Sequence, residues 1–173
     1  MNQLRVATTT LFLVLMLFVQ ETIINRINFP WHSFSLYLAA LLVLLAFEDR
    51  TGALVFGFLG GLVMDLSPGA ATPFGQWALA LTFIGYLFTV NRESIGDFTD
   101  RPVAFISFIS MSSALAMATF LFLGLFLGET NGGFLHNFGV IAANSVWSFF
   151  ITPIFLPLII RFRKFSLSSR DLI

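Results

Sequence analysis

The chain lacks cysteine and has few charged residues. Without cysteine it has neither disulfides nor thiolate metal sites. Only 10% of the residues are charged whereas 57% are hydrophobic, so the chain cannot cover a soluble domain with polar surface. The formal net charge is zero, which leaves no electrostatic footprint for binding nucleic acid. These absences predict an integral membrane protein with no room for a soluble domain.

Apolar runs make up most of the chain. Short polar connections separate six of them, at residues 6–19, 34–47, 53–66, 74–90, 103–127 and 140–160. The first is read as a retained helix, because Gln20 and Glu21 follow it where a signal peptide would have a small-residue cleavage site. A membrane span needs ~20 residues, so the second and third runs are short. The sequence predicts an all-α polytopic membrane protein, a compact bundle of six transmembrane helices forming one domain over residues 1–173.

The basic residues predict how the bundle is oriented. If the N-terminus is cytoplasmic, eight of the nine Lys and Arg residues lie on the cytoplasmic side and only Arg26 lies outside. Both termini are therefore expected in the cytoplasm. The connections at 20–33, 67–73 and 128–138 are expected outside. The basic and aromatic stretch 161–165 is expected to anchor the last helix at the membrane interface.

Small residues recur along the third apolar run. Ala53, Gly57, Gly61 and Asp65 are spaced by four and therefore lie on one face of a helix. In a bilayer such a face allows a second helix to approach closely, and it turns the aspartate towards protein. The close approach serves either packing within the chain or docking of a partner's helix. A second GxxxG spacing, between residues 124 and 128, allows the same two uses.

Asp65 is the main candidate for a polar function. Turn-forming residues 66–69 follow it, so its carboxylate is expected to accept hydrogen bonds from the backbone of that turn, or to pair with Arg26 or Gln76. In a cap of this kind asparagine would replace it almost without cost. The alternative is that Asp65 binds a partner protein directly.

The remaining polar residues of the apolar runs do not indicate an enzyme. The serines of the fifth run are expected to serve helix packing, because His32 and His136 lie in the outer connections, far in depth from them. No pair of ligand residues has helical spacing, so we expect no metal, and nothing indicates a cofactor. Asn144 is expected to form a hydrogen bond to another helix. Pro153 and Pro157 are expected to kink the last helix.

One long motif runs through the third and fourth runs. It reads G-F-x-x-G-L-x-x-D-L from Gly57, then Pro68, then G-x-x-A-L from Gly75 and G-Y from Gly85. This pattern resembles MreD, the membrane subunit of the bacterial rod shape-determining system. Gln20 and Asn144 agree with it, and the connection between the third and fourth runs is similar to that of actinobacterial versions. The resemblance covers nearly the whole chain.

The resemblance implies a function and a set of partners. Members of the family are non-enzymatic scaffolds of the cell-elongation machinery in the bacterial plasma membrane. They bind MreC, work indirectly with RodA and a class B penicillin-binding protein, and with MreB where it is present, and so help to direct peptidoglycan synthesis. The family is also similar to the six-helix substrate-binding subunits of energy-coupling-factor transporters.

That second similarity supplies an alternative function. A solute-binding subunit would hold a vitamin-sized molecule near the outer face and dock a coupling module. Such subunits usually carry a stripe of small residues on the first helix for the coupling module. Here Ala7 is followed at the same spacing by Leu11 and Leu15, so the stripe is missing. The sequence therefore favours the scaffold.

Overall fold

The computed structural model describes residues 3–26, 34–67, 72–93, 95, 101–129 and 133–168, and these residues form helices and no β-strand. The helices are α1 (Gln3–Thr22), a short 3-10 helix η1 (Ile24–Arg26), α2 (Leu36–Phe47), α3 (Arg50–Asp65), α4 (Gln76–Val90), α6 (Pro102–Phe126) and α7 (Phe134–Ser168). The prediction of an all-α protein is confirmed. Two of the predicted features, His32 and Pro68, lie outside the described residues.

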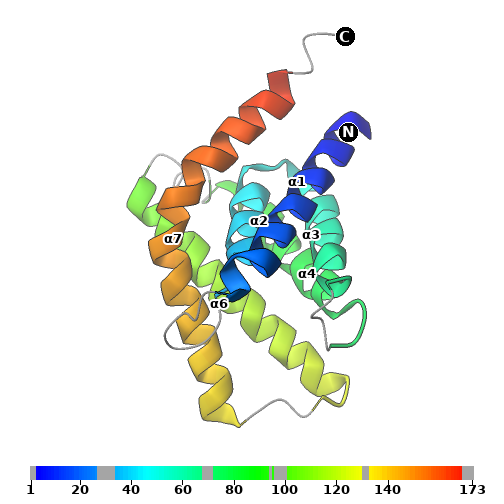
Figure 1. Ribbon diagram of the computed structural model, residues 1–173, viewed down its shortest axis with the longest axis vertical. Coiled ribbons are helices and arrows are strands. Elements are labelled where there is room, and N and C mark those ends of the chain that lie inside the picture. Colours follow the sequence, from blue (N-terminus) through cyan, green and yellow to red (C-terminus); the bar gives the residue numbers. More distant parts are fainter. Residues whose placement is uncertain are drawn as a thin grey trace.

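The two ends of the bundle are defined by which helix termini lie there. The beginning of α1 and the end of α7 lie at the same end of the molecule, which we call the Arg5 end (Figure 1). The last residues of α3 and the first of α4 lie at the opposite end, which we call the Asp65 end (Figure 1). α6 and α7 cross each other beside the cluster of α1 to α4 and extend past it at the Asp65 end (Figure 1).

α2 is the central helix of the molecule. Its sequence is apolar on every side, and each residue from Leu36 to Leu45 is buried. All the other α-helices of the described chain contact it. The Tyr37 hydroxyl donates a hydrogen bond of 2.8 Å to the Gly60 carbonyl and so ties α2 to α3. A helix that is apolar all round needs apolar neighbours on every side, and here the neighbours are protein.

Three of the described helices are long and apolar enough to cross a membrane, namely Arg5–Arg26, Pro102–Phe126 and Phe134–Phe162. Each exposes large apolar side chains along its length, for example Leu11, Leu15 and Phe18 on α1, Met111 and Phe122 on α6, and Phe150 and Ile154 on α7. Exposed apolar surface of this extent is unusual in a soluble monomer and suits contact with lipid.

The other three helices are short for a membrane span. α2, α3 and α4 contain 12, 16 and 15 residues. At about 1.5 Å per residue they extend about 18–24 Å, against about 30 Å for the hydrocarbon core of a bilayer. The length criterion therefore supports three of the six predicted spans. Backbone groups at the ends of the short helices need hydrogen-bond partners from protein, because lipid supplies none.

The last helix is longer than the sequence predicted. α7 begins at Phe134, where residue 140 was expected, and continues to Ser168 with Pro153 and Pro157 inside it. Each proline removes one backbone hydrogen bond. The chain nevertheless stays helical through both and changes direction towards its C-terminal part (Figure 1). The basic stretch 161–165 is consequently the end of a helix.

Candidate functional site

The face of α3 that carries Ala53, Gly57, Gly61 and Asp65 packs against α4. A Cβ atom placed on Gly57 would lie 2.6 Å from the Leu81 carbonyl oxygen, and one on Gly61 would lie 2.5 Å from the Trp77 carbonyl oxygen. α4 reciprocates with Gly85, where a Cβ would lie 2.5 Å from the Ala53 carbonyl oxygen. These distances leave no room for a side chain, so the two backbones are in direct contact. Of the two uses that the sequence left open, the structure displays packing within the chain for this face.

Asp65 lies at the C-terminal end of α3 and caps the beginning of α4. Its Oδ1 accepts a hydrogen bond of 3.0 Å from the Trp77 N–H, and its Oδ2 accepts one of 2.9 Å from the Ala78 N–H. Gly75, the N-cap residue of α4, has no side chain to do this. The negative charge also faces the positive end of the helix dipole. The donors are in the first turn of α4, whereas the sequence pointed to the turn that follows Asp65.

Neither of the pairings proposed for Asp65 is formed among the described residues. The side chain of Gln76 turns the other way and donates from Nε2 to the Phe120 carbonyl of α6, at 2.8 Å. Arg26 is exposed. Asp65 itself is only 9% exposed. It is therefore a buried carboxylate held by two backbone N–H groups and a helix dipole.

The beginning of α2 is capped in the same way by neighbouring helices. Gln20 of α1 accepts hydrogen bonds at its Oε1 from the Leu36 and Tyr37 N–H groups, at 2.8 and 3.3 Å. Ser35 is the N-cap residue and accepts from the Leu38 N–H through its hydroxyl. Asn144 of α7 accepts from the Ser35 N–H at 3.2 Å. Asn144 thus bonds to another segment, as predicted, and that segment is the start of α2.

Two glycines of the connections serve backbone geometry. Gly75 has φ +94° and Gly128 has φ +82°, a left-handed conformation that side chains disfavour. Gly128 follows α6, where the Glu129 N–H bonds to the Gly124 carbonyl and the Gly128 N–H bonds to the Leu125 carbonyl. This pair of bonds is a Schellman motif. Gly128 therefore ends α6. Apart from its chain neighbours, no atom of the described residues lies within 4 Å of the position of a Cβ on it, so the expected helix packing within the chain is not formed there. Docking of a partner's helix at Gly124 and Gly128 stays a prediction.

The serines of α6 join it to α7. Ser110 and Ser145 exchange hydrogen bonds between hydroxyls and carbonyls, at 2.7 and 3.0 Å. Ser148 donates to the Ser113 hydroxyl at 3.1 Å. Ser107 donates to a carbonyl of its own helix. In the part of the chain that the structure describes, no group of three or more His, Asp or Glu side chains is placed to hold a metal ion.

Charged residues at the Arg5 end form a second tie between helices. Arg5 of α1 forms an ion pair with Glu48, which is 3% exposed and directly follows α2. Arg92 donates to the Glu48 carbonyl. These contacts hold α1, the end of α2 and the end of α4 together. The positions of these arginines in the sequence indicate only the orientation of the bundle, and in the structure they also hold helices together.

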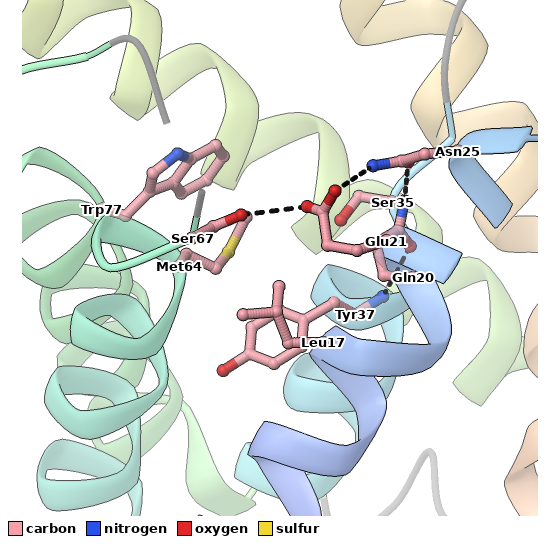
Figure 2. Close-up of a pocket in the computed structure, with 9 residues that line it drawn as sticks. All are labelled: Leu17, Gln20, Glu21, Asn25, Ser35, Tyr37, Met64, Ser67 and Trp77. Carbon is pink, nitrogen blue, oxygen red and sulfur yellow. Dashed lines mark hydrogen bonds between the residues drawn. The ribbon is translucent and has the colours of Figure 1, made fainter. Parts of the chain in front are cut away.

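A cavity of about 220 Å³ lies at the Asp65 end, between α1, α2, α3 and the start of α4 (Figure 2). Leu17, Tyr37, Met64 and Trp77 form its apolar part. Polar side chains form the rest, and Glu21 lies among them between Ser67 and Asn25 (Figure 2). The sequence does not predict this cavity. The one available signal was the polar pair Gln20 and Glu21 at the end of an apolar helix.

Comparison of the chain with protein-family models, with curated proteins and with solved structures finds no match.

Proposed function

We propose that the chain is a non-enzymatic membrane scaffold of the bacterial cell-elongation machinery, of the MreD type, which binds MreC and helps to direct peptidoglycan synthesis. The proposal is supported by the structural roles of the residues on which the resemblance to MreD rests. Gly57, Gly61 and Gly85 bring α3 and α4 into backbone contact. Asp65 and Asn144 satisfy buried backbone groups at the starts of the short helices.

A scaffold needs a rigid interior and a free exterior. Here Gln20, Asp65 and Asn144 accept hydrogen bonds from backbone groups inside the bundle. The outer faces of α1, α6 and α7, in contrast, carry exposed apolar side chains. Those faces are available to lipid and to transmembrane helices of partner proteins. We place the Arg5 end in the cytoplasm and the Asp65 end outside, because the basic residues are concentrated in the connections and termini of the Arg5 end.

The alternative, a solute-binding transporter subunit, has one observation in its favour, the cavity at the Asp65 end. Its volume of about 220 Å³ is below the roughly 300–1,000 Å³ of ordinary small-molecule sites. On α1, Leu11 and Leu15 are exposed, at positions where a coupling module would need small residues. The scaffold remains the better proposal.

Affinity purification in mild detergent tests the proposal. A tagged form of the chain, expressed in its own host, should retain MreC, with RodA and the class B penicillin-binding protein at lower yield. An unrelated tagged multi-helix membrane protein from the same membranes serves as the control. Retention of an ATPase coupling module in place of MreC would support the transporter subunit and contradict the scaffold.

A further inference from the structure

Most polar groups around the cavity at the Asp65 end are already paired with one another. Both N–H bonds of the Gln20 amide are used, one to the Asn25 Oδ1 at 2.7 Å and one to the Phe34 carbonyl at 2.9 Å. Its oxygen accepts from two backbone N–H groups of α2. The Tyr37 hydroxyl donates into the protein, to Gly60. These groups hold the wall in place and have little left to offer a ligand.

Glu21 differs from these groups because its carboxylate keeps free acceptor positions. Its Oε1 accepts a hydrogen bond of 2.9 Å from the Ser67 hydroxyl, and its Oε2 accepts one of 2.9 Å from the Asn25 amide (Figure 2). A carboxylate has about four acceptor positions, so each oxygen keeps spare capacity. Among the described residues that line the cavity, Glu21 and the Tyr37 phenol are the only ionisable groups, and no described basic side chain pairs with Glu21.

The apolar part of the cavity adds an aromatic ring, Trp77, to the carboxylate of Glu21. Trp77 stacks on Phe120 with ring centroids 3.9 Å apart, so its indole is held rigidly at one side of the cavity. Aromatic rings and a carboxylate together attract cations that carry donors, and they repel anions.

We propose that this cavity binds an ammonium group, with Glu21 as its counter-ion. A volume of about 220 Å³ suits a head group or a small amine and excludes acyl chains. The ammonium has two possible sources, the head group of phosphatidylethanolamine in the adjoining leaflet or a free amine in solution. The site is independent of the scaffold proposal, since it needs only Glu21 and the cavity.

Ligand binding to the purified full chain in detergent tests the site. The probes are dioleoyl-phosphatidylethanolamine, dioleoyl-phosphatidylglycerol and free ethanolamine, followed by native mass spectrometry and by the thermal unfolding midpoint. We expect phosphatidylethanolamine or ethanolamine to bind in preference to phosphatidylglycerol. Glu21→Gln should weaken that binding about tenfold or more, because the charge is lost while an amide oxygen still accepts one of the two wall bonds. Glu129→Gln, an acid at the same end that does not line the cavity, should bind like the wild type.

Each outcome decides the proposal or its source. Binding of phosphatidylethanolamine alone identifies a lipid head group, and binding of ethanolamine as well identifies a free amine. No preference over phosphatidylglycerol, or equal binding by wild type and Glu21→Gln, overturns the site. If Glu21→Gln does not fold, Met64→Phe takes its place, because it fills the cavity and keeps the carboxylate. It should lose the amine preference, and an unchanged preference would likewise overturn the site.

Discussion

Asp65 accepts two hydrogen bonds from a helix other than its own, with one carboxylate oxygen for each. The sequence indicated a cap, because an aspartate followed by turn residues is typical of one. It could not indicate the donors, since they lie across a connection whose path the sequence leaves open. The use of both oxygens also changes what asparagine can do at this position. An amide has one oxygen, and its NH₂ group would face the second N–H donor.

We expect Asp65→Asn to lower the stability of the purified protein by about 1–3 kcal/mol, and Asp65→Leu by about that amount for each of the two N–H groups left unpaired. The thermal unfolding midpoint in detergent should therefore fall in the order wild type, Asn, Leu. Asp49→Asn is the matched control, because the Asp49 side chain forms no cap hydrogen bond and its ion pair with Arg5 is long, at 3.8 Å. The Asp49 side chain is 59% exposed, and a surface ion pair of this kind contributes little to stability. A midpoint for Asp65→Asn equal to the wild-type value would show that one oxygen is enough.

Gln20 has a comparable position at the start of α2. Gln20→Leu removes the acceptor for the Leu36 and Tyr37 N–H groups. We expect those two amides to exchange with deuterated solvent much faster, with a loss of about 1–3 kcal/mol for each unpaired group. Thr22→Val serves as the control, since the Thr22 hydroxyl bonds only within its own helix. Unchanged protection at Leu36 and Tyr37 would contradict the cap.

At the scale of helices, the sequence patterns predicted which face of a helix is closely packed but not which helix packs against it. The spacing of Ala53, Gly57 and Gly61 correctly indicated a close-packed face, and only the structure identifies α4 as the neighbour. The apolar run of α2 could not be distinguished from a lipid-facing helix, because lipid and protein interior are equally apolar. Gly124 and Gly128 matched the same motif as the glycines of α3. Gly128 has a left-handed backbone conformation and ends the helix, and the spacing of the two glycines in the sequence does not predict this.

Gly61→Leu tests the contact between α3 and α4. A leucine at residue 61 would collide with the α4 backbone, which cannot move aside as a side chain can. We expect a large loss of monodisperse protein in size-exclusion chromatography. Phe58→Leu, on the exposed face of the same helix, should have little effect. Equal yields for the two variants would contradict backbone contact at Gly61.

At the scale of the whole molecule, the absence of native cysteine allows topology to be measured directly. Single cysteines at Arg26, Leu66 and Gly133 lie at or near the Asp65 end, and those at Asp49, Asn91 and Arg101 lie in connections of the Arg5 end. With intact cells, a membrane-impermeant maleimide should label the first three, and the others only after the membrane is opened. Labelling of Asn91 or Arg101 in intact cells would contradict the proposed orientation.

The most direct test joins architecture to function at the same residue. If Asp65 is architectural, replacing it should lower the stability of the protein and leave MreC binding intact as long as the protein remains folded. Thermal unfolding and MreC co-purification are therefore measured on Asp65→Asn and wild type, at a temperature where both remain folded. We expect a lowered midpoint together with near-normal retention of MreC. A normal midpoint with lost MreC would contradict the cap and make Asp65 a partner-binding residue.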